Sequence, residues 1–203
     1  FGLLDLGLTP TISRETSRYF GGSLSSLKFR QLFRALSSIF IFIAVLGGGT
    51  LYLLADEIAN NWLKIQTLNI NVVLVAIQIM AVSVALRWLT GLYRGIVIGA
   101  EKLVWLSAFS VVIATLRFLA VFISMYIFGY TPLVFFWHQL AVALLEFSIL
   151  LYKSTSLLPS KNLLDGNIGW SFAPISSILK FSLSIAFTSA IWVLITQTDK
   201  LIL

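Results

Sequence analysis

The sequence contains no cysteine and little charge. Of its 203 residues, 11% are Asp, Glu, Lys or Arg and 59% are hydrophobic. A soluble domain has about 25% charged and about 45–50% apolar residues. The lack of cysteine excludes disulfides and thiolate zinc sites. Because so few polar side chains are available to cover a core, the composition excludes a soluble domain.

Common enzyme motifs are also missing. The sequence has no GxxxxGK phosphate loop, no HExxH motif and no GxSxG motif. Asp and His are scarce between the apolar runs, which argues against an enzyme acting on lipid-linked sugars. We therefore expect no enzyme activity, no cofactor and no metal. The net charge of +6 is dispersed rather than gathered on one basic face, so we expect no nucleic-acid partner.

Long apolar runs predict membrane-spanning helices, since about 20 mostly apolar residues cross a bilayer. Complete spans are expected over residues 35–55, 65–86, 103–128 and 133–152. The opening run, to about Ile12, is expected to be the second half of another span. The runs do not alternate polar with apolar residues as β-barrel strands do. The sequence therefore predicts an all-α fold, a polytopic transmembrane helix bundle.

The Lys and Arg residues predict the orientation of these spans. Ten of them lie in the connections 14–34, 93–102 and 153–180, whereas the connections on the other side contain only Lys64. Short basic connections stay in the cytoplasm. We therefore expect these three segments to be cytoplasmic. Because the chain begins with Phe rather than Met, we also expect it to be an interior piece of a longer protein.

Two arginines fall inside apolar runs, where a charge costs about 2.5–3.5 kcal/mol at the bilayer centre. Arg117 lies near the middle of its span. It either faces a wet cavity or forms an ion pair that only ties helices together. Arg87 is expected close to the cytoplasmic end of its span, beside Trp88. It either snorkels to the interface or turns inward and assists Arg117.

Two acids are expected at similar depths, about 9–13 Å from the inner face. Asp5 and Glu146 could share a proton or a cation there, and they are the candidate ion-coupling residues. Alternatively, each acid pairs separately with a basic neighbour, or Asp5 accepts hydrogen bonds from backbone amides. His138 is expected to form a hydrogen bond between helices, with a titrating role as the alternative.

Two sets of glycines are spaced for close packing or turning. Gly91, Gly95 and Gly99 recur at every fourth position, which favours close helix contact or a tight turn. The triplet at 47–49 predicts either a hinge or a packing notch within its span.

Three stretches resemble bacterial polysaccharide flippases, which export lipid-linked units of O-antigen and related polymers. They are DLGLTPTISRETSRY, WLTGLYRGIVIGAEKLVWLSAFSVV and ILKFSLSIAFTSAIWVLITQTDKLIL. The resemblance implies a superfamily shared with multidrug exporters, and a two-lobe fold of about twelve to fourteen helices. In that fold, residues 1–152 would form most of the N-terminal lobe and 153–180 a cytoplasmic linker. Residues 181–203 would begin the C-terminal lobe.

The implied function is translocation of an undecaprenyl-diphosphate-linked oligosaccharide across the bacterial inner membrane by alternating access. In this reading Arg117 and Arg87 would bind the phosphate-bearing head, and Asp5 and Glu146 would couple transport to a proton or sodium ion. The expected partners are this substrate, membrane lipids and the polysaccharide polymerase machinery. The alternatives are a cation-coupled multidrug or metabolite exporter of the same fold, and a non-transporting membrane scaffold.

Overall fold

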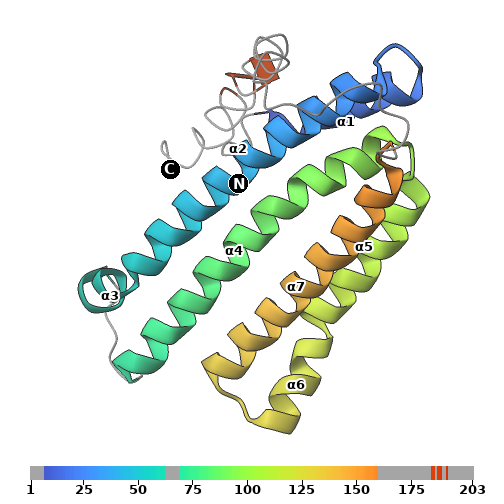
Figure 1. Ribbon diagram of the computed structural model, residues 1–203. Coiled ribbons are helices and arrows are strands. Elements are labelled where there is room, and N and C mark those ends of the chain that lie inside the picture. Colours follow the sequence, from blue (N-terminus) through green and yellow to red (C-terminus); the bar gives the residue numbers. More distant parts are fainter. Residues whose placement is uncertain (1–6, 63–68, 160–183, 186, 189–190, 192–203) are drawn as a thin grey trace.

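The computed structural model describes residues 7–62, 69–159, 184–185, 187–188 and 191. Its named elements are all helical (Figure 1): α1 (Leu8–Phe20), α2 (Ser26–Leu53), α3 (Ala55–Glu57), a π-helical segment (Ile58–Trp62), α4 (Ile70–Gly99), α5 (Leu103–Phe118), α6 (Ala120–Phe128) and α7 (Pro132–Leu157). Among the described residues, four segments are long and apolar enough to cross a membrane, namely α2, α4, α5 with α6, and α7. The expected fold class, an all-α bundle of membrane-spanning length, is confirmed.

The spanning helices extend beyond the apolar runs that predicted them. Helix α4 continues to Gly99 and α7 continues to Leu157. The expected loop at 93–102 is therefore wrong, since only Ala100–Lys102 separate α4 from α5. A single arginine within an apolar helix does not end it, because its backbone hydrogen bonds are unaffected. Most of the predicted linker, from residue 160 onward, lies outside the described residues.

Local side-chain chemistry fixes where the helices begin. The Asn69 side chain accepts a hydrogen bond of 2.9 Å from the Asn71 N–H at the start of α4. The Thr131 hydroxyl accepts one of 3.3 Å from the Val134 N–H at the start of α7. Such caps satisfy backbone donors that have no partner within the helix. Gly129, which follows α6 at a φ of 100°, and the Thr131 cap together form the turn between α6 and α7.

Helix α1 continues past the residue at which the first apolar run was expected to end. Gly7 adopts a φ of 69°, and the helix begins after it and continues to Phe20. Pro10 lies in the first turn, where a missing N–H costs no hydrogen bond. The expected end near Ile12 is therefore wrong, and Arg14 lies on the helix instead of in a loop. Asp5 lies outside the described residues.

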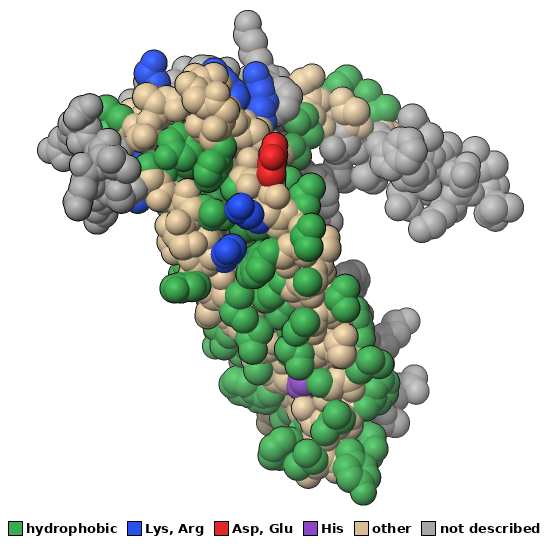
Figure 2. Space-filling model, turned by 90° about the vertical axis from the view of Figure 1, so that its right-hand side faces the viewer, with side chains coloured by type: hydrophobic (Ala, Val, Ile, Leu, Met, Phe, Trp, Pro, Cys, Tyr) green, Lys and Arg blue, Asp and Glu red, His purple; other side chains and the backbone are tan. Residues whose placement is uncertain are grey.

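The described parts of the three basic connections lie at one end of the bundle. The α1–α2 turn, the α4–α5 turn and the end of α7 lie together in Figure 1. The Ser17 hydroxyl donates to the Gly99 carbonyl at 3.0 Å, and Arg30 Nε donates to the Pro159 carbonyl at 2.9 Å. Figure 2 shows Lys and Arg side chains toward this end and a largely hydrophobic surface over the rest of that face.

Glycines let α1 and α2 pack closely against α4. A Cβ atom on Gly95 would overlap the Ile12 side chain and lie 2.9 Å from the Thr9 carbonyl oxygen. One on Gly48 would lie 2.7 Å from Ala85 Cβ. Both sites therefore serve helix packing. Within the triplet only Gly48 forms a notch, because a Cβ on Gly47 or on residue 49 would meet nothing within 4 Å.

We predict that Gly95→Ala destabilises the protein by about 1–3 kcal/mol, because the added methyl group must displace α1 from α4. Gly47→Ala is the matched control, since its methyl group points into open space. It should leave the protein as stable as before, or slightly more stable. Thermal melting of the two variants in detergent measures the difference. Equal melting temperatures would contradict the packing role of Gly95.

Candidate functional site

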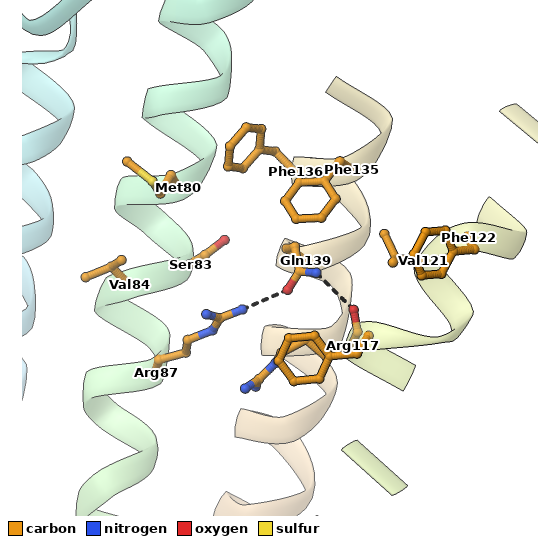
Figure 3. A pocket seen from close by; sticks show the side chains of 11 residues that line it. Met80, Ser83, Val84, Arg87, Arg117, Val121, Phe122, Phe135, Phe136 and Gln139 are labelled. Atoms are coloured by element: carbon orange, nitrogen blue, oxygen red, sulfur yellow. Dashed lines mark hydrogen bonds between the residues drawn. The ribbon is translucent and has the colours of Figure 1, made fainter. Parts of the chain in front are cut away.

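Two arginines and a glutamine line a pocket between α4, α5, α6 and α7. Arg87, Arg117 and Gln139 contribute its charged and amide groups, and its volume is about 440 Å³ (Figure 3). The remaining lining side chains are apolar apart from one hydroxyl: Met80, Ser83, Val84, Phe118, Val121, Phe122, Phe135 and Phe136. A few polar groups within an apolar wall are typical of small-molecule sites, and the volume falls within their usual range.

Arg87 points inward toward α7. Its Nη2 donates to Gln139 Oε1 at 2.9 Å, and its buried Nε has no partner among the described residues. The expectation that Arg87 snorkels at a helix end is therefore wrong, since α4 continues for about 18 Å beyond it. Trp88 packs against Phe40 of α2, with 5.5 Å between the ring centroids. The structure agrees with the other expectation, in which Arg87 turns inward.

Arg117 on α5 forms an ion pair with the buried Glu146 on α7. The Arg117 Nη2 to Glu146 Oε2 distance is 2.5 Å, with 22% and 7% of the side chains exposed. The other carboxylate oxygen, Oε1, lies 3.4 Å from Nη2 of Arg94. The expected alternative, in which Glu146 pairs with a basic neighbour, thus describes this structure. Arg117 forms an ion pair and also lines the pocket.

Two polar contacts join α4 to α7, and they are spaced equally along both helices. Arg87 and Arg94 are seven residues apart on α4, and Gln139 and Glu146 are seven residues apart on α7. Because a seven-residue step returns to the same helix face, α4 and α7 meet through two successive polar contacts. Sequence reasoning missed Arg94 because it placed that residue in a loop. It missed Gln139 because an uncharged residue gives no signal in a charge census.

The interruption between α5 and α6, at Leu119, is bridged by side chains of α7. His138 Nε2 lies 2.9 Å from the Leu116 carbonyl oxygen, and Gln139 Nε2 donates to the Arg117 carbonyl at 3.1 Å. The last carbonyls of a helix lack partners within the helix, and hydrocarbon offers none. Because a carbonyl only accepts, Nε2 carries the proton and Nδ1 accepts from the Ser124 hydroxyl at 2.8 Å. His138 is thus a hydrogen bonder between helices, as expected.

The site carries more positive than negative charge. Arg87, Arg94 and Arg117 surround a single described acid, Glu146. Burying an uncompensated charge is costly, so this arrangement favours an anionic ligand. The described residues contain no group of three or more His, Cys, Asp or Glu side chains that could hold a metal ion.

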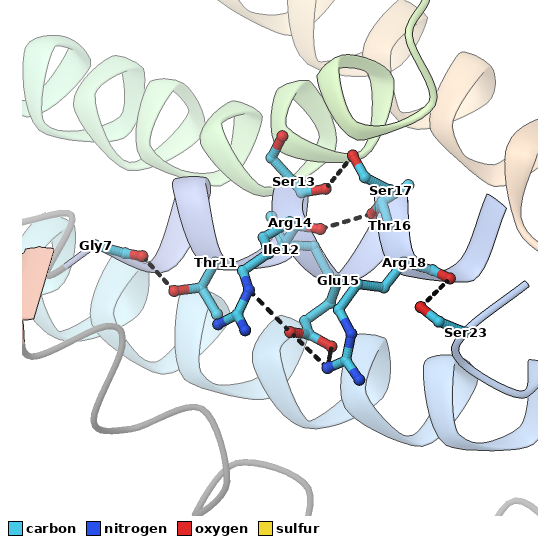
Figure 4. A network of polar contacts seen from close by, with 10 residues as sticks. All are labelled: Gly7, Thr11, Ile12, Ser13, Arg14, Glu15, Thr16, Ser17, Arg18 and Ser23. Carbon is cyan, nitrogen blue, oxygen red and sulfur yellow. Dashed lines mark hydrogen bonds and ion pairs between the residues drawn. The ribbon is translucent and has the colours of Figure 1, made fainter. Parts of the chain in front are cut away.

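A second buried acid belongs to a local network on α1. The Glu15 side chain is 3% exposed, and its carboxylate lies 2.9 Å from Arg18 Nη1 and 4.0 Å from Arg14 Nε (Figure 4). Both arginines are nearly half exposed. The cluster stabilises the end of α1 and contributes nothing to the pocket.

Searches of protein-family models, curated proteins and solved structures find no match to this chain. In the described part of the chain, the fold and the site define an all-helical protein with four segments of membrane-spanning length and an apolar pocket bordered by arginines.

We predict that Glu146→Gln lowers the free energy of unfolding by about 1–3 kcal/mol, because it leaves the largely enclosed Arg117 guanidinium without its counter-charge. Glu101→Gln is the control, since Glu101 is an exposed acid in the α4–α5 turn and its loss should change little. Thermal melting in detergent compares the two. If both variants melt at the same temperature, the ion pair contributes nothing.

Proposed function

We propose that this chain is part of a flippase that moves an undecaprenyl-diphosphate-linked oligosaccharide across the bacterial inner membrane by alternating access. The observation that carries the proposal is the convergence of Arg87 and Arg117 on an apolar-walled pocket. The resemblance of three sequence stretches to polysaccharide flippases supports the same function. In this proposal the chain supplies most of the N-terminal lobe, and the polymerase machinery receives the exported unit.

The chemistry of the pocket fits a lipid-linked diphosphate. A guanidinium group presents a planar fork of donors that matches phosphate oxygens. The diphosphate brings negative charge, which would neutralise the excess of arginines over Glu146. The phenylalanine side chains of the wall are suited to the hydrocarbon next to the diphosphate. A cationic drug would meet repulsion here, so the pocket disfavours a multidrug exporter.

Glu146 is the proposed coupling residue. Its two carboxylate oxygens face different arginines, so protonation would release both. Arg117 would then be available to the substrate, and deprotonation of Glu146 would restore the Arg117–Glu146 ion pair. Asp5 remains a predicted second coupling residue, outside the described residues.

We predict that Arg117→Ala reduces export of surface polymer at least about tenfold, because the pocket loses a guanidinium that would donate hydrogen bonds to the phosphate oxygens. Arg117→Lys should keep part of the activity, since it retains the charge without the fork. Lys102→Ala, which removes an exposed charge from the α4–α5 turn, is the control. Surface polymer is measured in cells that contain each full-length variant at equal membrane levels. Normal polymer with Arg117→Ala would remove this residue from the site.

The basic end of the bundle is proposed to face the cytoplasm. We predict that a cysteine replacing Ser23, in the α1–α2 turn, is labelled only after the inner membrane is permeabilised. A cysteine replacing Asn60, at the opposite end, should be labelled in spheroplasts by a reagent that does not cross membranes. Both positions are exposed, and the chain has no other cysteine. The reverse pattern would contradict the orientation.

A non-transporting scaffold is the second candidate, favoured by the Arg117–Glu146 ion pair. The two functions differ in the hydration of the pocket. In a transporter, Arg117→Cys should react with a water-soluble thiol reagent at a rate that changes when substrate is added. In a scaffold the same cysteine should stay protected.

A further inference from the structure

Arginines occur at two depths along the same face of α4. Arg94 lies five residues, about 7 Å along the axis, before the end of α4 at Gly99. Arg87 lies twelve residues, about 18 Å, before that end. Arg94 is therefore about 10 Å nearer to the end that we assign to the cytoplasm. Both side chains contact α7, Arg94 through Glu146 and Arg87 through Gln139.

The shallower arginine is also held more loosely. Its Nη2 lies 3.4 Å from Glu146, whereas Nη2 of Arg117 lies 2.5 Å from the same carboxylate. The Arg94 side chain is 36% exposed and the Arg117 side chain 22%. An incoming anion can therefore reach Arg94 first. It would displace the Arg94–Glu146 contact, which is longer than the Arg117–Glu146 contact. Glu146 keeps Arg117 compensated while this happens.

We propose that Arg94 is the entry site for the phosphate-bearing head of the substrate, which then moves inward to Arg87 and Arg117. This inference rests on the proposed flippase function and adds a first binding step to it. Arg94 thereby becomes a substrate-binding residue that acts before the pocket is filled. An entry site governs capture of substrate from the membrane surface, while the deeper arginines govern the translocation that follows.

The test is transport of a fluorescent undecaprenyl-diphosphate-linked oligosaccharide by the full-length protein in proteoliposomes. Arg94→Gln should raise the half-saturating substrate concentration about tenfold, as expected for loss of one charge-assisted hydrogen bond. Its maximal rate should stay within about twofold of the unchanged protein. Arg94→Lys should restore part of the capture, because it keeps the charge. Lys102→Gln, which removes an exposed positive charge from the α4–α5 turn, is the matched control and should leave the half-saturating concentration unchanged.

Several outcomes separate this inference from the flippase proposal. If Arg94→Gln matches Lys102→Gln and the unchanged protein in half-saturation, the entry site is wrong and the flippase stands. A fall in maximal rate with unchanged half-saturation indicates a structural role and also overturns the entry site. If Arg94→Gln fails to insert into the membrane, Arg94→Lys tests the entry site instead. A raised half-saturating concentration in Arg94→Lys supports the entry site, and an unchanged one overturns it, because lysine lacks the guanidinium group. If the unchanged protein moves no substrate, the flippase proposal itself fails.

Discussion

The pairing of charge in hydrocarbon is the constraint on which this structure depends. Arg117 is tolerated within a spanning segment because Glu146 lies 2.5 Å away on the neighbouring helix. The same carboxylate reaches Arg94, so one acid connects α4, α5 and α7. Hydrocarbon provides no solvent to replace these partners. The relative positions of the three helices are consequently set by polar contacts as well as by apolar packing.

The backbone carbonyls at the end of α5, before Leu119, also need polar partners in hydrocarbon. Helix α5 ends there, and Gln139 donates to the exposed carbonyl of Arg117 while its oxygen accepts from Arg87. One glutamine thus connects the interruption in the spanning segment to the arginine across the pocket. The contacts from Arg87 through Gln139, Arg117 and Glu146 to Arg94 return to α4, where they began. A movement of α7 against α4 must therefore change the Arg87 and Arg94 contacts together.

The sequence predicted the four complete spans because hydrocarbon length and apolar composition determine them directly. It misplaced the helix ends, because a charged residue ends an apolar run without ending the helix, and α4 continues to Gly99. That error put Arg87 at an interface and Arg94 in a loop. The ion pair of Glu146 was foreseen only as an alternative, since partners on separate helices depend on the register between α4 and α7.

Arg87 distinguishes a transport site from a purely structural network more sharply than Arg117 does. Packing alone explains Arg117, Arg94 and Glu146, because their charges meet within the bundle. The described hydrogen bond of Arg87 goes to a neutral amide, whereas Arg117 pairs with a carboxylate. The Nε of each arginine is buried without a partner among the described residues. An apolar side chain would serve a structural role better, because a charge enclosed among apolar helices is costly without a counter-charge. An anion in the pocket would supply the missing partner.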